Sequence, residues 1–184
     1  MFSKRTELRL AQLTREFFAR HPGVKLVAVT GSAGKSSAKV AIATTLAQQL
    51  NVQLREEEPR SKSEVFLQIM GVVMPTHGPF KLWRALRAVK KRVKAQRPEV
   101  QVIVQEFNPR ELGYNGWFRD YLVPDIAVIT SVTNGRMQVE HPLEEVAHEM
   151  ITLANNSHTA MINRDDIEGR FAGFLTNPRI TTYG

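Results

Sequence analysis

The segment VAVTGSAGKSSAKVAIATTLAQ, which begins at Val27, constrains the fold of this chain more than any other part of it. Residues 25–30 are apolar and rich in β-branched side chains, which predicts a strand buried within a parallel sheet. Residues 35–50 have the length and composition of a helix. Gly31 and Gly34 stand between the two elements and predict a sharp turn.

Apolar segments of the same kind recur along the chain and alternate with helical stretches. Further strands are expected at residues 100–106, 125–130, 158–163 and 179–184, and helices at about 1–22, 64–73, 110–122 and 143–154. This alternation predicts an α/β fold in which helices cover both faces of a parallel sheet. In such folds ligands bind beyond the carboxyl ends of the strands, where we expect the turn at Gly31 to lie.

Length and composition limit the possible classes of protein. The chain has 184 residues, of which 42% are hydrophobic, so we expect one domain with a single sizeable core. It has no cysteine, which excludes disulfide bonds and zinc–thiolate sites and agrees with a cytoplasmic location. The N-terminal residues lack the pattern of a secretory signal, and no apolar run approaches the roughly 18 residues of a membrane span.

The turn carries the chemical groups that bind a nucleoside triphosphate. Glycines let backbone amides approach phosphate oxygens, and the start of the following helix favours negative charge. Lys35 can reach the β- and γ-phosphates, and the Ser36 hydroxyl can ligate Mg²⁺. We therefore predict a P-loop site for ATP and Mg²⁺, formed by Thr30, Gly31, Ser32, Ala33, Gly34, Lys35, Ser36 and Ser37. The pattern is the shorter G-x-x-G-K-S, because Val29 replaces the first glycine of the usual motif, and the alternative is a plain turn with a solvated lysine.

Glu106 is a second candidate for the same site. It ends the apolar run VQVIV, so we expect its carboxylate at the sheet edge that also holds the turn at Gly31. A carboxylate at that edge can hold Mg²⁺ directly or through water. The alternative is a solvated carboxylate at the end of a strand.

Six segments also carry a resemblance to a known family. They are VAVTGSAGKSS, VIVQEFNPRELG, VPDIAVITSVTNG, HPLEEVA, AMINRDD and TTYG. In order and spacing they resemble the central, ATP-binding domain of the Mur ligases, the bacterial amide-bond ligases of peptidoglycan precursor synthesis. The resemblance extends over most of residues 24–184 and is greatest to the ligases that add D-alanyl-D-alanine to the muramyl tripeptide.

The resemblance implies an acyl-phosphate mechanism and a role for individual residues. ATP phosphorylates a substrate carboxylate, and an incoming amine then displaces the phosphate. By position, Lys35 would neutralise the β- and γ-phosphates, Ser36 would ligate the first Mg²⁺, and Glu106 would assist that metal, so Lys35 and Glu106 are the expected catalytic residues. Phosphoryl transfer depends on positioned positive charge more than on a protein nucleophile, which agrees with these roles.

The chain also departs from the family pattern. The family commonly has a histidine near the metal, and Arg136 stands there in this chain, while Asn134 and Arg136 are expected to line the nucleotide site. The family also uses a lysine, often carbamylated, in the following helix, where this chain offers His148 or Met150. We therefore expect the second metal site of the family to be missing or rebuilt.

Two further domains of the family have no counterpart in residues 1–184. One binds the UDP-sugar end of the substrate, and the other helps bind the amino substrate and closes on ATP. A UDP-muramyl peptide or a lipid-linked precursor is the expected substrate class, and a partner protein could supply these domains. An excised domain, a truncated product and a short paralogue all agree with this sequence.

Residues 81–97, KLWRALRAVKKRVKAQR, hold eight basic residues and no acidic residue. The rest of the chain carries 17 basic and 18 acidic side chains, so the net charge of +7 belongs to this one segment. Leu82, Leu86, Val89 and Val93 form an apolar stripe at helical spacing. A solvated helix packed on the sheet is one interpretation, contact with anionic lipid or a precursor is another, and nucleic acid is the least favoured.

Three functions remain open on this sequence. The first is the Mg·ATP-binding domain of a Mur-type ligase, incomplete as a catalyst in this chain alone. The second is a degenerate module that binds a nucleotide or a partner without catalysis, which Arg136 and the missing lysine favour. The third is an unrelated small P-loop NTPase or kinase.

Overall fold

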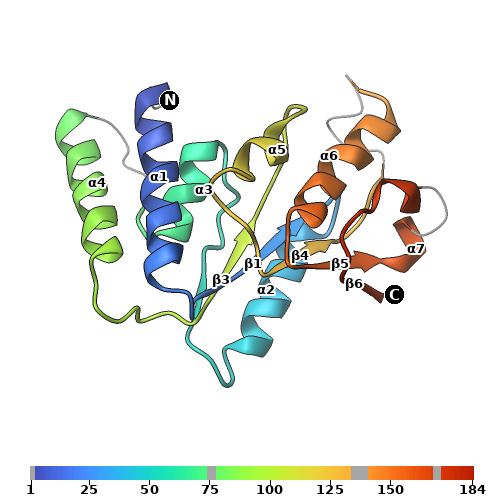
Figure 1. Cartoon of the computed structure of the whole chain (residues 1–184), viewed down its shortest axis with the longest axis horizontal. Coiled ribbons are helices and arrows are strands. Elements are labelled where there is room, and N and C mark those ends of the chain that lie inside the picture. Colours follow the sequence, from blue (N-terminus) through green and yellow to red (C-terminus); the bar gives the residue numbers. More distant parts are fainter. Residues whose placement is uncertain (1–2, 74–77, 134–140, 168–170) are drawn as a thin grey trace.

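A computed structural model describes residues 3–73, 78–133, 141–167 and 171–184, and within them the chain forms a six-stranded sheet in the order β2-β3-β1-β4-β5-β6 (Figure 1). All neighbouring strands are parallel, so the α/β class with a parallel sheet is confirmed. The strands are β1 (Lys25–Thr30), β2 (Val52–Leu54), β3 (Val102–Glu106), β4 (Ile126–Ile129), β5 (Thr159–Asn163) and β6 (Ile180–Tyr183).

Helices cover both faces of this sheet, as the sequence predicts. Figure 1 shows α2 on one side of the sheet and α1, α3 and α6 on the other. The helices are α1 (Lys4–Arg20), α2 (Lys35–Leu46), α3 (Lys62–Ile69), α4 (Pro79–Val93), α5 (Tyr114–Phe118), α6 (Leu143–Asn155) and α7 (Arg164–Ile167). No helix among these residues is long and apolar enough to cross a membrane.

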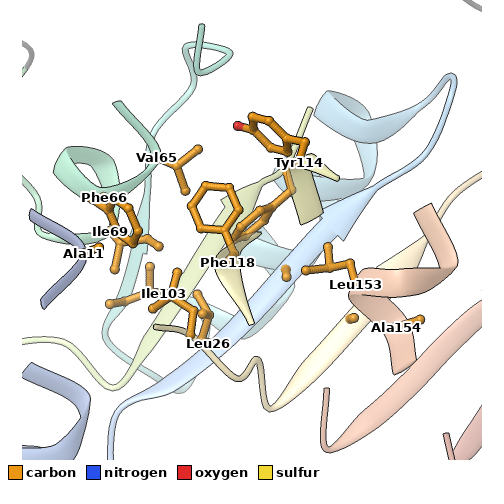
Figure 2. Close-up of a cluster of buried hydrophobic side chains, with 14 of the residues drawn as sticks. Ala11, Leu26, Val65, Phe66, Ile69, Ile103, Tyr114, Phe118, Leu153 and Ala154 are labelled. Atoms are coloured by element: carbon orange, nitrogen blue, oxygen red, sulfur yellow. The ribbon is translucent and has the colours of Figure 1, made fainter. Parts of the chain in front are cut away.

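The alternation of side chains along β1 divides the core into two parts. Leu26 and Ala28 point to the face covered by α1, α3 and α6, whereas Val27 and Val29 point to α2. The first face holds the larger cluster, which includes Leu26 and Ile103 and in which Phe118 packs against Phe66 and Tyr114 (Figure 2). With both faces covered, β1 is an almost continuous apolar run rather than an alternating one.

Three predicted helices are shorter than expected, and each has a local reason. α2 ends at Leu46 instead of residue 50, because the chain tightens into a last turn in which Gln49 N donates to Leu46 O. α3 ends at Ile69 instead of residue 73, where Gly71 adopts a φ of +64° and Val72 N donates to Leu67 O. This is a Schellman C-cap, which a glycine makes accessible.

The helix expected at residues 110–122 is reduced to five residues of α5. Gly113 precedes it with a φ of +79°, and the carboxylate of Glu149 accepts hydrogen bonds from the amides of Gly113 (2.7 Å) and Asn115 (2.5 Å). The start of α5 is therefore fixed by a carboxylate from α6, which local sequence does not reveal. β2, a three-residue strand at the edge of the sheet, was missed by the sequence analysis.

Candidate functional site

The turn predicted to bind phosphate lies at the carboxyl end of β1, in the middle of the sheet between β3 and β4. It is held there by the residues that follow β4. Ser131 O accepts a hydrogen bond from Ser32 N (2.8 Å), Ser131 Oγ accepts one from Ala33 N (3.0 Å), and Thr130 Oγ1 donates to Ala33 O (2.5 Å). The shape of the turn therefore depends on two neighbouring strands.

Gly31 allows the turn to lie this close to β4. It has a φ of +141°, and a Cβ atom at this position would lie 2.2 Å from Thr130 Oγ1 and 2.9 Å from Ser131 N. No side chain fits in this space, so the first glycine of the motif is required for packing as well as for backbone conformation.

The start of α2 presents backbone amides to solvent at the same edge. Gly34 begins the helix with a φ of +76°, and no side chain of the described residues caps it. The first intrahelical bond runs from Ala38 N to Gly34 O (2.9 Å), so the amides of Lys35, Ser36 and Ser37 precede it. Uncapped amides at the start of a 12-residue helix form a site suited to an anion such as phosphate.

The residues expected to hold a metal lie together at this edge. Ser36 Oγ donates to Glu106 Oε2 at 3.1 Å, which joins the start of α2 to the end of β3. The register explains this proximity, because Val29 and Glu106 are paired on adjacent strands and the turn begins two residues later, at Gly31. A hydroxyl beside a carboxylate provides the oxygen ligands that Mg²⁺ prefers.

Lys39 joins the same cluster, and the sequence analysis missed it. Its Nζ lies 3.0 Å from Glu106 Oε2 and donates to Glu56 O at 3.0 Å, and the side chains of Lys39 and Glu106 are each only 1% exposed. A buried carboxylate and a buried ammonium each require a partner of opposite charge. Each supplies that partner for the other beneath the phosphate turn.

A signal for Lys39 was present in the sequence. It lies four residues before Ala43, and these two residues form the buried face of α2. A lysine in line with the apolar side of a helix that packs on a sheet needs a buried acceptor. Glu106, at the end of a neighbouring strand, is the carboxylate in reach.

Of the two side chains that the sequence offered at the family's lysine position, Met150 is the one that faces the turn. Ser32 Oγ donates to Met150 Sδ at 3.9 Å and accepts a hydrogen bond from Thr133 N at 3.0 Å. His148 instead packs edge-to-face on Phe174. The side of the site formed by α6 is therefore lined by a thioether, which is a poor ligand for Mg²⁺.

The other predicted site residues fall at the same edge or outside the described residues. Thr30 ends β1, is buried, and its hydroxyl has no hydrogen-bond partner among the described residues. Lys35 is half-buried in the first turn of α2. Asn134 and Arg136 lie outside the residues that the structure describes. In the described ranges no group of three or more His, Cys, Asp or Glu side chains is placed to hold a metal ion.

Comparisons with known proteins agree with this architecture. The model of the family described as the Mur ligase middle domain matches residues 29–184. No curated protein sequence matches the chain.

Solved structures give the same result at the level of the fold. MurF from Acinetobacter baumannii superimposes with a TM-score of 0.74 and 15% identity over 97% of this chain and 35% of that protein. MurF from Thermotoga maritima in complex with ADP gives a TM-score of 0.61 and 15% identity over 100% and 38% of the two chains. A mutant of L. casei FPGS gives a TM-score of 0.55 and 17% identity over 99% of this chain and 50% of that protein. The chain thus spans between about one third and one half of these proteins.

Proposed function

Because the chain belongs to the Mur ligase middle-domain family, we propose that it binds Mg·ATP as the ATP-binding domain of a Mur-type amide ligase. The reaction would belong to peptidoglycan precursor synthesis, since MurF structures share the fold. Membership of this family argues against an unrelated P-loop kinase.

The observation that carries the proposal is the buried ion pair of Lys39 and Glu106 beneath the phosphate turn, with the exposed Ser36 hydrogen-bonded to the same carboxylate. A plain surface turn needs no buried ion pair, and burying two charges is costly unless they have a structural or functional role. Here the pair fixes the carboxylate beside the hydroxyl that a P-loop uses for its metal. The uncapped start of α2 also suits a phosphate chain.

Each residue has a distinct role in this proposal. Lys35 and the amides at the start of α2 bind the β- and γ-phosphates, and they stabilise the charge that develops during transfer. Ser36 and Glu106 would hold Mg²⁺, which would neutralise charge on phosphate oxygens. Ser36 and Lys39 both contact Oε2 of Glu106, so Oε1 would be the oxygen available to the metal. Lys39 is a positioning residue, since it acts through Glu106.

The chemistry that these groups support is phosphoryl transfer to a carboxylate. A carboxylate oxygen of a UDP-muramyl peptide bonds to the γ-phosphorus while the bond to the bridging oxygen breaks and ADP leaves. The nitrogen of an incoming amine then bonds to the acyl carbon and loses a proton, and phosphate departs. The muramyl and amine sites would come from the remainder of a longer ligase or from a partner protein.

Met150 favours a second candidate function, a nucleotide-binding module without catalysis. Its thioether stands on the side of the site where the family uses a lysine, so the second metal of the family would lack a ligand there. In this case the domain would bind Mg·ATP through Ser36 and Glu106 but would not transfer the phosphoryl group.

Titration with a fluorescent ATP analogue, with and without Mg²⁺, tests the metal site directly. We expect Mg²⁺ to tighten binding by the wild type, and Ser36→Ala and Glu106→Gln to remove that dependence. Thr45→Ala is the control, because it removes a hydroxyl from the far end of the same helix. Mg²⁺-independent binding by the wild type would contradict the assignment. When the domains or partner that supply the muramyl and amine sites are also present, phosphate release on addition of UDP-muramyl tripeptide and D-alanyl-D-alanine would favour the ligase, and tight ATP binding without release would favour the module.

A further inference from the structure

α4 is an outer helix of the molecule, with a buried inner side and an exposed outer side. Figure 1 shows it beside α1 at one end of the fold, and Ala85, Val89 and Val93 are buried on its inner side. The remaining apolar positions of the predicted stripe, Leu82 and Leu86, are half-buried. This inner stripe accounts for the packing of α4, so the residues on its outer side are not needed to hold the helix in place.

Two aromatic side chains lie exposed near the N-terminal end of the outer side. Phe80 is 67% exposed and Trp83 is 53% exposed. Their rings stack with centroids 6.0 Å apart and planes 20° apart, and the guanidinium of Arg87 lies 5.4 Å from the centre of the Trp83 ring. Neither aromatic residue belongs to the hydrophobic core clusters of the described residues. Paired exposed aromatic rings indicate a contact surface.

Basic side chains continue this surface toward the C-terminal end of α4. Five basic side chains, together with the two rings and Ala88, line a shallow hollow of about 780 Å³. The five are Arg84, Arg87, Lys90, Lys91 and Lys94. Residues 81–97 contain no acidic residue that could compensate these charges locally. We call the two rings and the five basic residues the α4 face.

We propose that the α4 face docks this domain onto an anionic lipid surface. The rings of Phe80 and Trp83 would enter the interfacial layer, where aromatic side chains are favoured, and the five cations would contact phosphate headgroups. Charge complementarity supports this occupant, because the net charge of +7 is concentrated on this one segment. The inference does not depend on nucleotide binding.

The arrangement of the rings favours lipid over nucleic acid. A single-stranded nucleic acid is bound by open aromatic faces on which bases stack. In α4 the ring of Trp83 is contacted by Phe80 from the preceding turn and by Arg87 from the following turn. The Trp83 ring is therefore already in contact with two side chains, which suits insertion among headgroups better than stacking of a base on that ring.

Vesicle sedimentation of the full chain without nucleotide tests the proposal. We expect binding to vesicles of phosphatidylcholine with phosphatidylglycerol, and none to phosphatidylcholine alone. The triple variant Arg84→Gln, Arg87→Gln, Lys90→Gln should bind on the order of 100-fold more weakly, since each cation near an anionic surface contributes about 1 kcal/mol. The matched control is Arg110→Gln, Arg119→Gln, Arg179→Gln, which removes the same charge from exposed positions elsewhere and should bind nearly as the wild type.

The aromatic contribution is tested separately. Phe80→Ser with Trp83→Ser should weaken vesicle binding at unchanged net charge. In a Trp117→Phe background, which leaves Trp83 as the sole tryptophan, anionic vesicles should shift its emission to shorter wavelength. Equal loss in the control triple variant, unchanged binding without the two rings, or tighter binding to a single-stranded oligonucleotide than to vesicles would each overturn the proposal.

Discussion

Basic side chains have opposite environments in the two regions that distinguish this molecule. At the phosphate turn, Lys39 is buried and forms an ion pair with Glu106, which fixes the position of a carboxylate. On the α4 face the cations are exposed and lie beside exposed rings. Burial gives a single charge a structural role, whereas exposed charges act together and each contributes little. Sequence motifs locate both regions, but only burial tells which kind of role a lysine has.

Replacing the two lysines of α2 should give the largest difference. Lys39→Met leaves the buried carboxylate of Glu106 without its cation, and we expect it to lower the free energy of unfolding by about 3–5 kcal/mol. Lys35→Met changes a half-buried residue and should alter stability by less than about 0.5 kcal/mol. Urea unfolding of both variants measures the difference. Equal stabilities would show that the buried pair is not a structural element.

The two glycines of the turn provide the next test. Gly31→Ala introduces a Cβ atom that would lie 2.2 Å from Thr130 Oγ1, and we expect a loss of about 3 kcal/mol because β4 must shift. Gly34→Ala meets its nearest atom at 3.9 Å and carries only the strain of a φ of +76°, about 1 kcal/mol. Thermal unfolding measures both values, and an equal cost would mean that the turn is not packed against β4 as described.

Tyr114 is a further buried side chain that can ionise, and it can be compared with the exposed charges in the same way. Burial raises the pKa of Tyr114 above its ordinary value, and nearby acidic residues add to this effect while Arg110 opposes it. The folded state favours the neutral phenol. The contribution of Tyr114 to the free energy of unfolding is therefore complete below the unfolded pKa of about 10 and is lost as pH rises above that value. We expect the wild type to lose about 1.4 kcal/mol per pH unit above pH 10 relative to Tyr114→Phe. Parallel pH dependences of urea unfolding for the two proteins would contradict this.

The smallest effect is expected on the α4 face. The triple variant Arg84→Gln, Arg87→Gln, Lys90→Gln removes exposed charges, so its stability should lie within about 0.5 kcal/mol of the wild type while its vesicle binding falls. Urea unfolding provides the stability. A loss above about 1 kcal/mol would mean that these residues are part of the packing of α4.

Much of the sheet could be predicted from the sequence because its strands are short, buried and bounded by clear signals. The predicted range of β1 matches the structure, and β3, β4, β5 and β6 lie within their predicted ranges. The errors arise where contacts distant in sequence decide the local structure. α5 starts later than predicted because Glu149 of α6 binds the amides at its start, and β2 has too few residues to carry a pattern.

Some residues of the candidate site could likewise be predicted from the sequence, and others could not. Gly31, Lys35 and Ser36 follow from one local motif, and the placement of Glu106 beside Ser36 follows from the shared edge of parallel strands. Lys39, Thr130 and Ser131 required the structure. Their roles depend on which strand lies next to the turn and on which side of α2 faces the sheet, and neither is given by residue spacing alone.

Calorimetric titration of Mg·ATP into the wild type and Lys35→Ala tests the central claim most directly. Lys25→Ala is the matched control, since Lys25 lies at the opposite end of β1 and pairs with Asp125. We predict binding of one nucleotide by the wild type and by Lys25→Ala, and an affinity at least tenfold lower in Lys35→Ala, as expected from the loss of one charged hydrogen bond. Equal affinity in all three proteins, or no binding by the folded wild type, would contradict the assignment of this turn as a nucleotide site.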